Sequence, residues 1–151
     1  MAWSTYKFGS RVDLENFLNG KIVSRHNAHA GMDVDGLTLI IDTIGTPRTA
    51  TFTPVKSRLW TLDEVVTLVN AAHAELAGIA SIESISGSGK SWRRIVFGVG
   101  AVFTIVKTGT ANVLFGLSST ADTVAAPVVK ADVQSIHSIA GERDIWVAII
   151  S

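Results

Sequence analysis

The chain contains no cysteine among its 151 residues. That absence excludes disulfide bonds, thiolate metal sites and cysteine nucleophiles. Charge is also scarce, because Asp, Glu, Lys and Arg make up 17% of the residues, compared with about 25% in ordinary globular domains. Since the cores of protein interfaces are depleted of charged residues, this composition favours a chain that associates with copies of itself.

Neither sign of charge is in excess. Basic and acidic side chains number 13 each, so the formal net charge is zero. No overall basic field is present to attract nucleic acid, and nucleic acid is not expected as a partner. Local basic positions occur at Arg93–Arg94 and around Arg48, Lys56 and Arg58, and we interpret them as solvated faces.

Long apolar runs are missing as well. None approaches the roughly 20 residues that a membrane-spanning helix needs. A secretory signal has an apolar run after its positive charge, and no such run follows Met1–Lys7. We therefore expect synthesis in a cytoplasm and no membrane partner. The length fits a single domain over residues 1–151, and no low-complexity linker divides it.

The first third of the chain predicts one short helix and a β-hairpin. Ser10 can cap a helix that ends at Asn19–Gly20, where the glycine can adopt the left-handed conformation. Residues 21–32 follow no regular pattern and predict a loop or an irregular extended segment. A strand over 36–42 and an alternating strand over 49–55 are joined by a short turn, so we expect them to pair as antiparallel neighbours.

The strongest local pattern is a helix over residues 62–77. Thr61 and Glu64 form a Thr-x-x-Glu capping box at its start. Apolar residues then recur with a period of 3.6 as far as Leu76, and Gly78 supplies the stop. His73 falls on the apolar face, so we interpret it as a packed, hydrogen-bonded helix residue rather than as a catalytic one.

Short strands follow this helix over residues 79–86, 92–99 and 101–107. Thr110 can then cap a single helical turn before Gly116. Residues 133–139 are compatible with a strand or a short helix, and we favour a strand. The wholly apolar run 145–150 predicts a central strand or an oligomer contact, because an exposed edge of that kind would aggregate.

These elements predict an α+β fold. We expect a mainly antiparallel sheet or a small barrel, with one long helix packed on a face and one short N-terminal helix. Trp60 stands directly before the capping residue of the long helix, where it can pack against Val65 as a hydrophobic staple.

Two segments carry residue types found in ligand sites. Residues 84–91 end in Gly-Lys-Ser, but Ser84 replaces the first glycine of a phosphate-binding loop and a strand pattern follows Ser91. Without a helix N-terminus the aligned N–H groups that hold phosphate are missing, so we interpret the segment as a hairpin turn. We expect no cofactor.

The second segment holds His26 and His29, followed by Asp33 and Asp35. They lie in an irregular region where two imidazoles have no fixed geometry, and zinc needs further ligands in a defined arrangement. We therefore predict no metal site and place both histidines on a surface or interface. No G-x-S-x-G elbow is present either, so we expect that the chain is not an enzyme.

Three short stretches together are similar to a recurring structural motif: TFT at 51–53, TLDEVV at 61–66 and LVNAA at 68–72. They resemble the IN motif of flagellin and hook-associated proteins, and related modules of tailed-phage virion proteins. There a strand precedes T-L-x-E-V-V-x-x-I-N-A-A, and short strands and an L-G-[LF] ending follow. Here LFGL at 114–117 stands at the ending. Terminal coiled-coil heptads of the flagellin type are absent, so filament formation of that kind is not implied.

The resemblance implies a structural subunit of a phage particle, in the neck, the tail or the head. Such a subunit would assemble with copies of itself into a symmetric ring or lattice, contact other virion proteins and bind no small-molecule substrate. It would be synthesised in the host cytoplasm and end in the virion. Residues 48–117 would form the core, and 1–47 and 118–151 would be flanking assembly elements. As interface residues we select Phe8, Phe17, His26, His29, Trp146, Ile149 and Ile150.

The alternative interpretation is a carbohydrate- or nucleic-acid-binding module that uses Trp92, Arg93 and Arg94. An aromatic ring next to cations is the combination on which bases stack. Such a module also requires a basic groove beside the ring, which this stretch alone does not establish.

Overall fold

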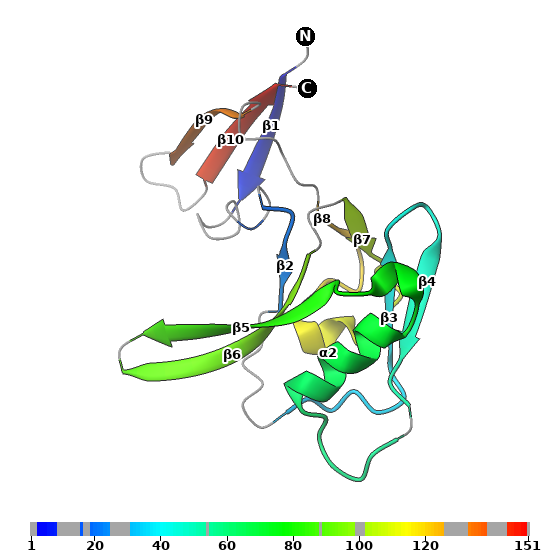
Figure 1. The fold of residues 1–151 in the computed structure, drawn as a ribbon. Helices are drawn as coiled ribbons and strands as arrows, with labels where there is room; N and C mark the ends of the chain where they lie inside the picture. The colour runs from blue at the N-terminus through cyan, green and yellow to red at the C-terminus, as the bar shows by residue number, and fades with distance from the viewer. Residues whose placement is uncertain are drawn as a thin grey trace.

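The computed structural model describes residues 3–8, 16, 19–24, 31–53, 55–87, 89–98, 102–125, 133–138 and 145–150. Within them lie ten strands in three antiparallel sheets, one α-helix and two 3₁₀ helices (Figure 1). The strand orders are β1-β10-β9, β2-β6-β5 and β4-β3-β7-β8. The predicted α+β class with antiparallel sheets is therefore confirmed, whereas the described residues form no closed barrel.

The four-stranded sheet begins with the predicted hairpin. Strands β3 (Thr38–Asp42) and β4 (Pro47–Thr51) pair in antiparallel fashion with Leu39 opposite Ala50. Alternation places Leu39, Ile41 and Ala50 in the core. The other edge of β3 carries β7 (Phe103–Ile105), and β8 (Thr123–Ala125) pairs with β7.

Helix α2 (Leu62–Ala71) starts as predicted and ends six residues earlier than predicted. Both hydrogen bonds of the Thr61–Glu64 capping box are present, and Leu62, Val65 and Val69 are buried. The long helix over 62–77 is therefore wrong. Ala72 is exposed, so a continued helix would bury little there, and the chain instead turns at His73 into the 3₁₀ helix η1 (Ala74–Leu76).

His73 consequently does not lie on a packed helical face. Its backbone is extended, with φ −155° and ψ 151°, and its Nδ1 accepts a hydrogen bond from the backbone N–H of Glu75 at 3.4 Å. Leu76 is fully buried, so the apolar stripe does reach the core through η1. Gly78 then takes a left-handed φ of 75°, as its predicted role as the stop requires.

Strands β5 (Ala80–Gly87) and β6 (Lys90–Phe97) form a hairpin with eight paired positions and no shift of register. Gly87 lies opposite Lys90, and Gly89 between them has φ 72°, which suits a two-residue hairpin turn. The predicted turn over Gly87–Lys90 is therefore confirmed, and a strand rather than a helix begins at Lys90. Strand β2 (Ile22–Val23), in a stretch predicted as irregular, pairs with the other edge of β6.

The 3₁₀ helix η2 (Asn112–Phe115) follows β7. Gly116 after it is left-handed, with φ 70°. Thr110 does not cap it as predicted, because Ala111 is the capping residue and its side chain makes no cap hydrogen bond. The Thr110 hydroxyl instead accepts the backbone N–H of Thr38 at 2.8 Å and so fastens this turn to β3.

Aromatic side chains join these elements into one core. Phe115 of η2 packs edge to face on Phe97 of β6, with ring centroids 5.5 Å apart. Its centroid lies 6.4 Å from that of Phe52, and Phe52 packs edge to face on Trp60 at 5.6 Å. All four rings are buried, so η2, the β6 strand and the segments beside β4 and α2 share a single apolar interior.

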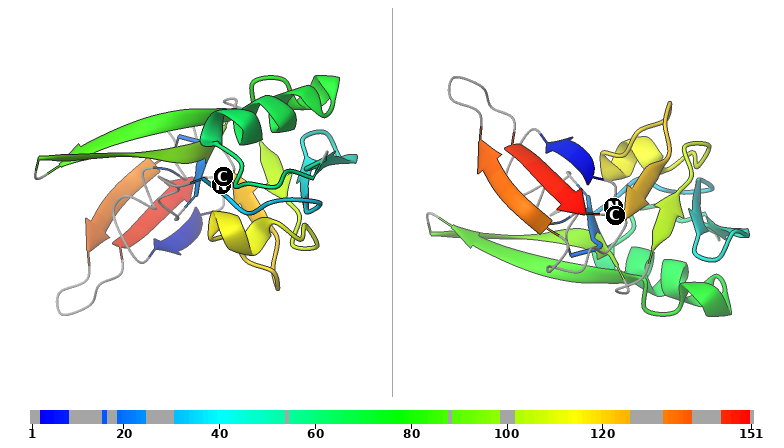
Figure 2. Two further views of the ribbon diagram at one scale, coloured as in Figure 1. Left: turned by 90° about the horizontal axis from the view of Figure 1, so that it is seen from below. Right: turned by 90° about the horizontal axis from the view of Figure 1, so that it is seen from above.

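The third sheet joins the beginning of the described chain to its end. Strand β10 (Ile145–Ile150) lies between β1 (Trp3–Phe8) and β9 (Val133–Ser138), as Figure 2 shows. The prediction of a central strand over 145–150 is confirmed, as is the strand in 133–139. Strand β1 was not predicted.

The short N-terminal helix predicted from Ser10 falls mostly outside the described residues. Its end is described: the N–H of Lys21 donates to the carbonyl of Asn16 at 2.9 Å, and Gly20 has φ 65°. This is the predicted glycine-terminated helix end. No helix within the described stretches is both long and apolar enough to cross a membrane.

Candidate functional site

Four of the seven predicted assembly residues fall in the terminal sheet. Phe8 ends β1 opposite Ile145, and the neighbouring rungs pair Trp146 with Lys7 and Ile149 with Ser4. Ile150, opposite Trp3, completes the ladder. The structure thus brings these residues, widely separated in sequence, onto adjacent strands. The predictions for Phe17, His26 and His29 lie outside the described residues.

The residues of the alternative binding module do not form one basic surface. Arg93 and Arg94 are successive residues of β6, so their side chains project to opposite faces of the sheet. Arg93 lies 3.2 Å from a carboxylate oxygen of Asp63, and Arg94 lies 2.8 Å from one of Glu83. Each guanidinium is therefore engaged with a carboxylate, and a basic groove for sugars or bases is not formed by this pair.

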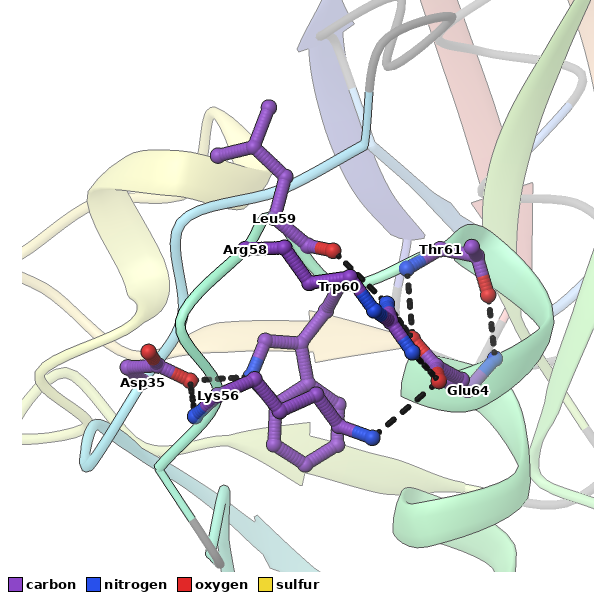
Figure 3. Close-up of polar contacts among 7 residues, drawn as sticks. All are labelled: Asp35, Lys56, Arg58, Leu59, Trp60, Thr61 and Glu64. Atoms are coloured by element: carbon purple, nitrogen blue, oxygen red, sulfur yellow. Dashed lines mark hydrogen bonds and ion pairs between the residues drawn. The ribbon is translucent and has the colours of Figure 1, made fainter.

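A cluster of polar contacts surrounds Trp60, just before α2 (Figure 3). Trp60 is only 3% exposed, and its indole N–H donates to the Asp35 carboxylate at 2.5 Å. The same carboxylate oxygen accepts the backbone N–H of Lys56 at 2.9 Å. A buried indole thus keeps a partner for its only donor, while Asp35 fixes the loop that precedes the helix.

The Trp60 backbone is held from the other side by Met32. Their N–H and C=O groups exchange two hydrogen bonds, of 2.8 and 2.9 Å. Gly31, next to Met32, has φ +99°, and a Cβ there would lie 2.6 Å from the Trp60 carbonyl oxygen. Only glycine allows this close approach.

Glu64 is the hub of the same cluster. Its carboxylate accepts from both terminal nitrogens of Arg58, at 2.6 and 2.8 Å, from the Thr61 N–H at 2.9 Å and from Lys56 Nζ at 3.1 Å. The Arg58 hydrogen bonds, followed by those from Thr61 and Lys56, hold the pKa of Glu64 far below its ordinary value of 4.5. Glu64 is therefore charged at neutral pH and is unsuited to general acid catalysis there.

Lys56 links the two halves of the cluster. Its ammonium lies 4.6 Å from the centroid of the Trp60 ring, within the range of a cation–π contact, and also pairs with Glu64. The loop between β4 and α2 is therefore fixed at Lys56 and at Arg58. Beside these fixed points it presents two exposed apolar side chains, Val55 before Lys56 and Leu59 after Arg58.

A second ion pair fixes the far end of the helical segment. Arg48 of β4 makes a bidentate contact with Glu75 of η1, at 2.6 and 3.0 Å. This hydrogen bonding lowers the pKa of Glu75 and raises that of Arg48. His73 Nδ1 lies 3.7 Å from the Glu75 carboxylate. The pair fastens η1 to the four-stranded sheet.

Asn70 of the VNAA stretch binds the backbone of Ala80. Its side-chain amide donates to the Ala80 carbonyl at 2.9 Å and accepts the Ala80 N–H at 2.8 Å. The amide therefore presents to the first residue of β5 the same donor and acceptor that a neighbouring strand would present. Asn70 joins the last turn of α2 to the beginning of the hairpin.

Asn112 organises the LFGL ending in a similar way. It is 1% exposed, and its Nδ2 donates to the carbonyl oxygens of Val106 at 2.9 Å and Ser118 at 3.2 Å. A Cβ at Gly109 would lie 2.6 Å from Asn112 Oδ1, so glycine is required there. The turn between β7 and η2 is thus set by one buried amide.

These clusters are suited to holding segments together. Their carboxylates are occupied by cations or backbone N–H groups, and no group of three metal-ligating side chains occurs in the part of the chain that the structure describes. Of the two acids that follow the predicted histidines, Asp35 binds the Trp60 indole and the Lys56 N–H.

Sequence reasoning missed most of this cluster. Lys56 and Arg58 were interpreted as solvated, whereas both contact Glu64, and nothing local connects Asp35 with a tryptophan 25 residues away. The capping box and Trp60 next to it were the available signals. Two cations, Lys56 and Arg58, precede the capping glutamate Glu64 by eight and six residues, and this spacing is the signal that could have suggested the ion pairs.

Comparison with known proteins identifies no relative: no protein-family model matches the chain, and no curated protein or solved structure gives a significant match.

Proposed function

We propose that this chain is a structural subunit of a tailed-phage particle, in its neck or tail, that assembles with copies of itself and with other virion proteins. The observation that carries the proposal is the role of the residues behind the IN-like resemblance. Thr61 and Glu64 cap α2, Asn70 binds β5, and Phe115–Gly116 close the core. Each serves the rigidity of the body rather than a reaction.

The composition of the surface supports association. Exposed apolar residues include Ile44, Val55 and Leu59 on loops, Val102 directly before β7, and Val124 on β8, an outer strand of the four-stranded sheet. Many of the described charged side chains pair with each other within the chain, so they are already neutralised. A surface of this kind loses little charge solvation when it is covered by another subunit.

The oligomeric mass tests this proposal. Light scattering on a size-exclusion column should give an integer multiple, at least two, of the 16.0 kDa chain mass. The oligomeric mass should stay the same at elevated salt, because exposed ion pairs are not expected to stabilise the contact between copies. Peptides of the chain should also be found by mass spectrometry in purified particles from cells that produce them. A monomer at millimolar concentration, together with absence from particles, would refute the proposal.

A further inference from the structure

The outer edge of the β5 strand is the feature from which a specific contact can be derived. In the order β2-β6-β5, β5 is the last strand, so only one of its two edges is paired within the described residues. An eight-residue edge strand is a template for pairing with another chain, and proteins usually protect such edges with lysine, proline or a bulge. Strand β5 (ASIESISG) has none of these, and Glu83 is its only charge.

The backbone alternation identifies which groups point to the open edge. The N–H of Gly98 donates to the Ile79 carbonyl at 2.8 Å, and Ala80, one residue later, directs its own N–H and C=O away from β6 to Asn70. Because the pattern alternates along an antiparallel strand, the groups of Ile82, Ser84 and Ser86 also point outward. Asn70 therefore occupies the first outward position, and three remain.

These limits define the centre of the open edge. Asn70 closes it at Ala80, and the turn after Gly87 closes it at the other end. The remaining positions, Ile82, Ser84 and Ser86, are symmetric about Ser84. In an antiparallel pair of two β5 strands, Ser84 would lie opposite itself, and Ile82 of each copy opposite Ser86 of the other, so that all outward groups find partners.

The charges permit this pairing. With Ser84 at the centre, Glu83 falls opposite Ile85 of the second copy, so the two Glu83 carboxylates are not directly opposed. Each is also neutralised by Arg94 of its own chain, at 2.8 Å. Like charges directly opposite would destabilise a sheet contact, and this register avoids them.

From these observations we propose that two copies of the chain pair antiparallel through their β5 edges, centred on Ser84, to give the continuous order β2-β6-β5-β5-β6-β2. This inference rests on the proposed structural role and names one of its self-contacts. In Figures 1 and 2 the β5–β6 hairpin extends beyond α2, so the helix does not cover the part of the hairpin near its turn. An isolated two-stranded ribbon has marginal stability, so added strands stabilise it.

A single cysteine tests the register directly, since the natural chain has none. In the Ser84→Cys variant, mild oxidation or a short thiol-to-thiol cross-linker should convert most of the protein into a covalent dimer. Residues directly opposite in an antiparallel pair have Cα atoms about 5.5 Å apart, within disulfide range. The matched control is Ser81→Cys, an exposed residue of the same strand that would lie three positions from the symmetry centre and should give little dimer.

A second variant tests the backbone contact. Ser84→Pro removes an N–H that points away from β6, so the hairpin should keep its circular dichroism spectrum. Self-association should weaken about tenfold or more, because both copies then carry a proline ring at the contact and lack the N–H of residue 84. If the chain is oligomeric but Ser84→Cys gives no more dimer than Ser81→Cys, the β5 contact is wrong and the structural role stands. If the chain is monomeric, the β5 contact is wrong, and the structural role fails as well if the chain is also absent from purified particles.

Discussion

Single polar side chains in this protein replace the partners that backbone groups would otherwise lack. Asn70 supplies a donor and an acceptor to Ala80, and Asn112 binds two carbonyl groups from within the core. A buried backbone group without a partner costs more than a hydrogen bond gains, so these amides have a large effect for their size. Neither is visible from local periodicity, because Asn70 binds a residue ten positions along the chain and Asn112 binds carbonyl groups six positions away on either side.

Replacing Asn70 should destabilise the protein at the junction of α2 and β5. We expect Asn70→Ala to lower the free energy of unfolding by about 1–3 kcal/mol, because the N–H and C=O of Ala80 lose their partners. Chemical denaturation followed by circular dichroism measures this change. Thr67→Ala, on an exposed position of the same helix, is the control and should change stability by no more than about 0.5 kcal/mol.

The Asn70→Asp variant separates the two hydrogen bonds. A carboxylate can still accept from the Ala80 N–H, but it faces the Ala80 carbonyl without a proton to donate. Its loss of stability should therefore be larger at neutral pH than near pH 4, where the acid is partly protonated. Equal stability of the Asn70→Ala variant and the natural chain would show that the amide is not a structural link.

At the scale of elements, the capping region of α2 depends on a charged glutamate. The pKa of Glu64 is lowered in the folded chain, so its contribution to stability is present above the unfolded value near 4.5 and is lost as the pH falls toward the folded value. Glu75, whose pKa is also lowered, acts in the same direction at η1. The free energy of unfolding should therefore decrease below about pH 5.

Substitution of Glu64 should reduce this pH dependence. In Glu64→Gln the neutral amide can still accept from the Thr61 N–H, but the attraction to Arg58 and Lys56 is lost. We expect a lower free energy of unfolding at pH 7 and a shallower decrease between pH 5 and pH 3, measured by urea denaturation at each pH. Arg58→Met should instead shift the decrease to higher pH, since it removes the main cause of the lowered pKa. A profile for Glu64→Gln that matches the natural chain would contradict this account.

The elements also show where sequence patterns suffice. The alternation over 49–55, the capping box and the Gly87–Lys90 turn are local signals. The hairpin, the start of α2 and the turn form where predicted, although β4 covers Pro47–Thr51 rather than 49–55. The end of α2 is different. Apolar spacing continues to Leu76 and the obvious stop is Gly78, but contacts of Asn70 with Ala80 and of Glu75 with Arg48 redirect the chain after Ala71. These contacts join residues 10 and 27 positions apart, which local patterns do not report.

At the scale of the whole molecule, the two ends of the described chain meet. The Trp3–Ile150 pair opens a ladder that runs to Phe8 and Ile145. The apolar composition of β10 predicts a central strand. Its partner β1 is not predicted, because Trp3–Phe8 mixes apolar and polar residues without a strict alternation. Among the strand pairs of the described residues, this one joins the positions farthest apart in the sequence, and contacts of that kind form slowly during folding.

This arrangement predicts that the chain tolerates circular permutation. Opposite residues of an antiparallel ladder lie about 4.5–5.5 Å apart, so a short Gly/Ser linker can join Ser151 to Met1 without disturbing β1 or β10. New ends placed in the exposed β3–β4 turn, between Ile44 and Gly45, interrupt no strand pair. The permuted chain should show the circular dichroism spectrum and the cooperative thermal transition of the natural chain. Ends placed instead between Val147 and Ala148 divide the central strand, and that permutant should lose the cooperative transition. If both permutants unfold alike, the β1–β10 ladder does not hold the terminal sheet together.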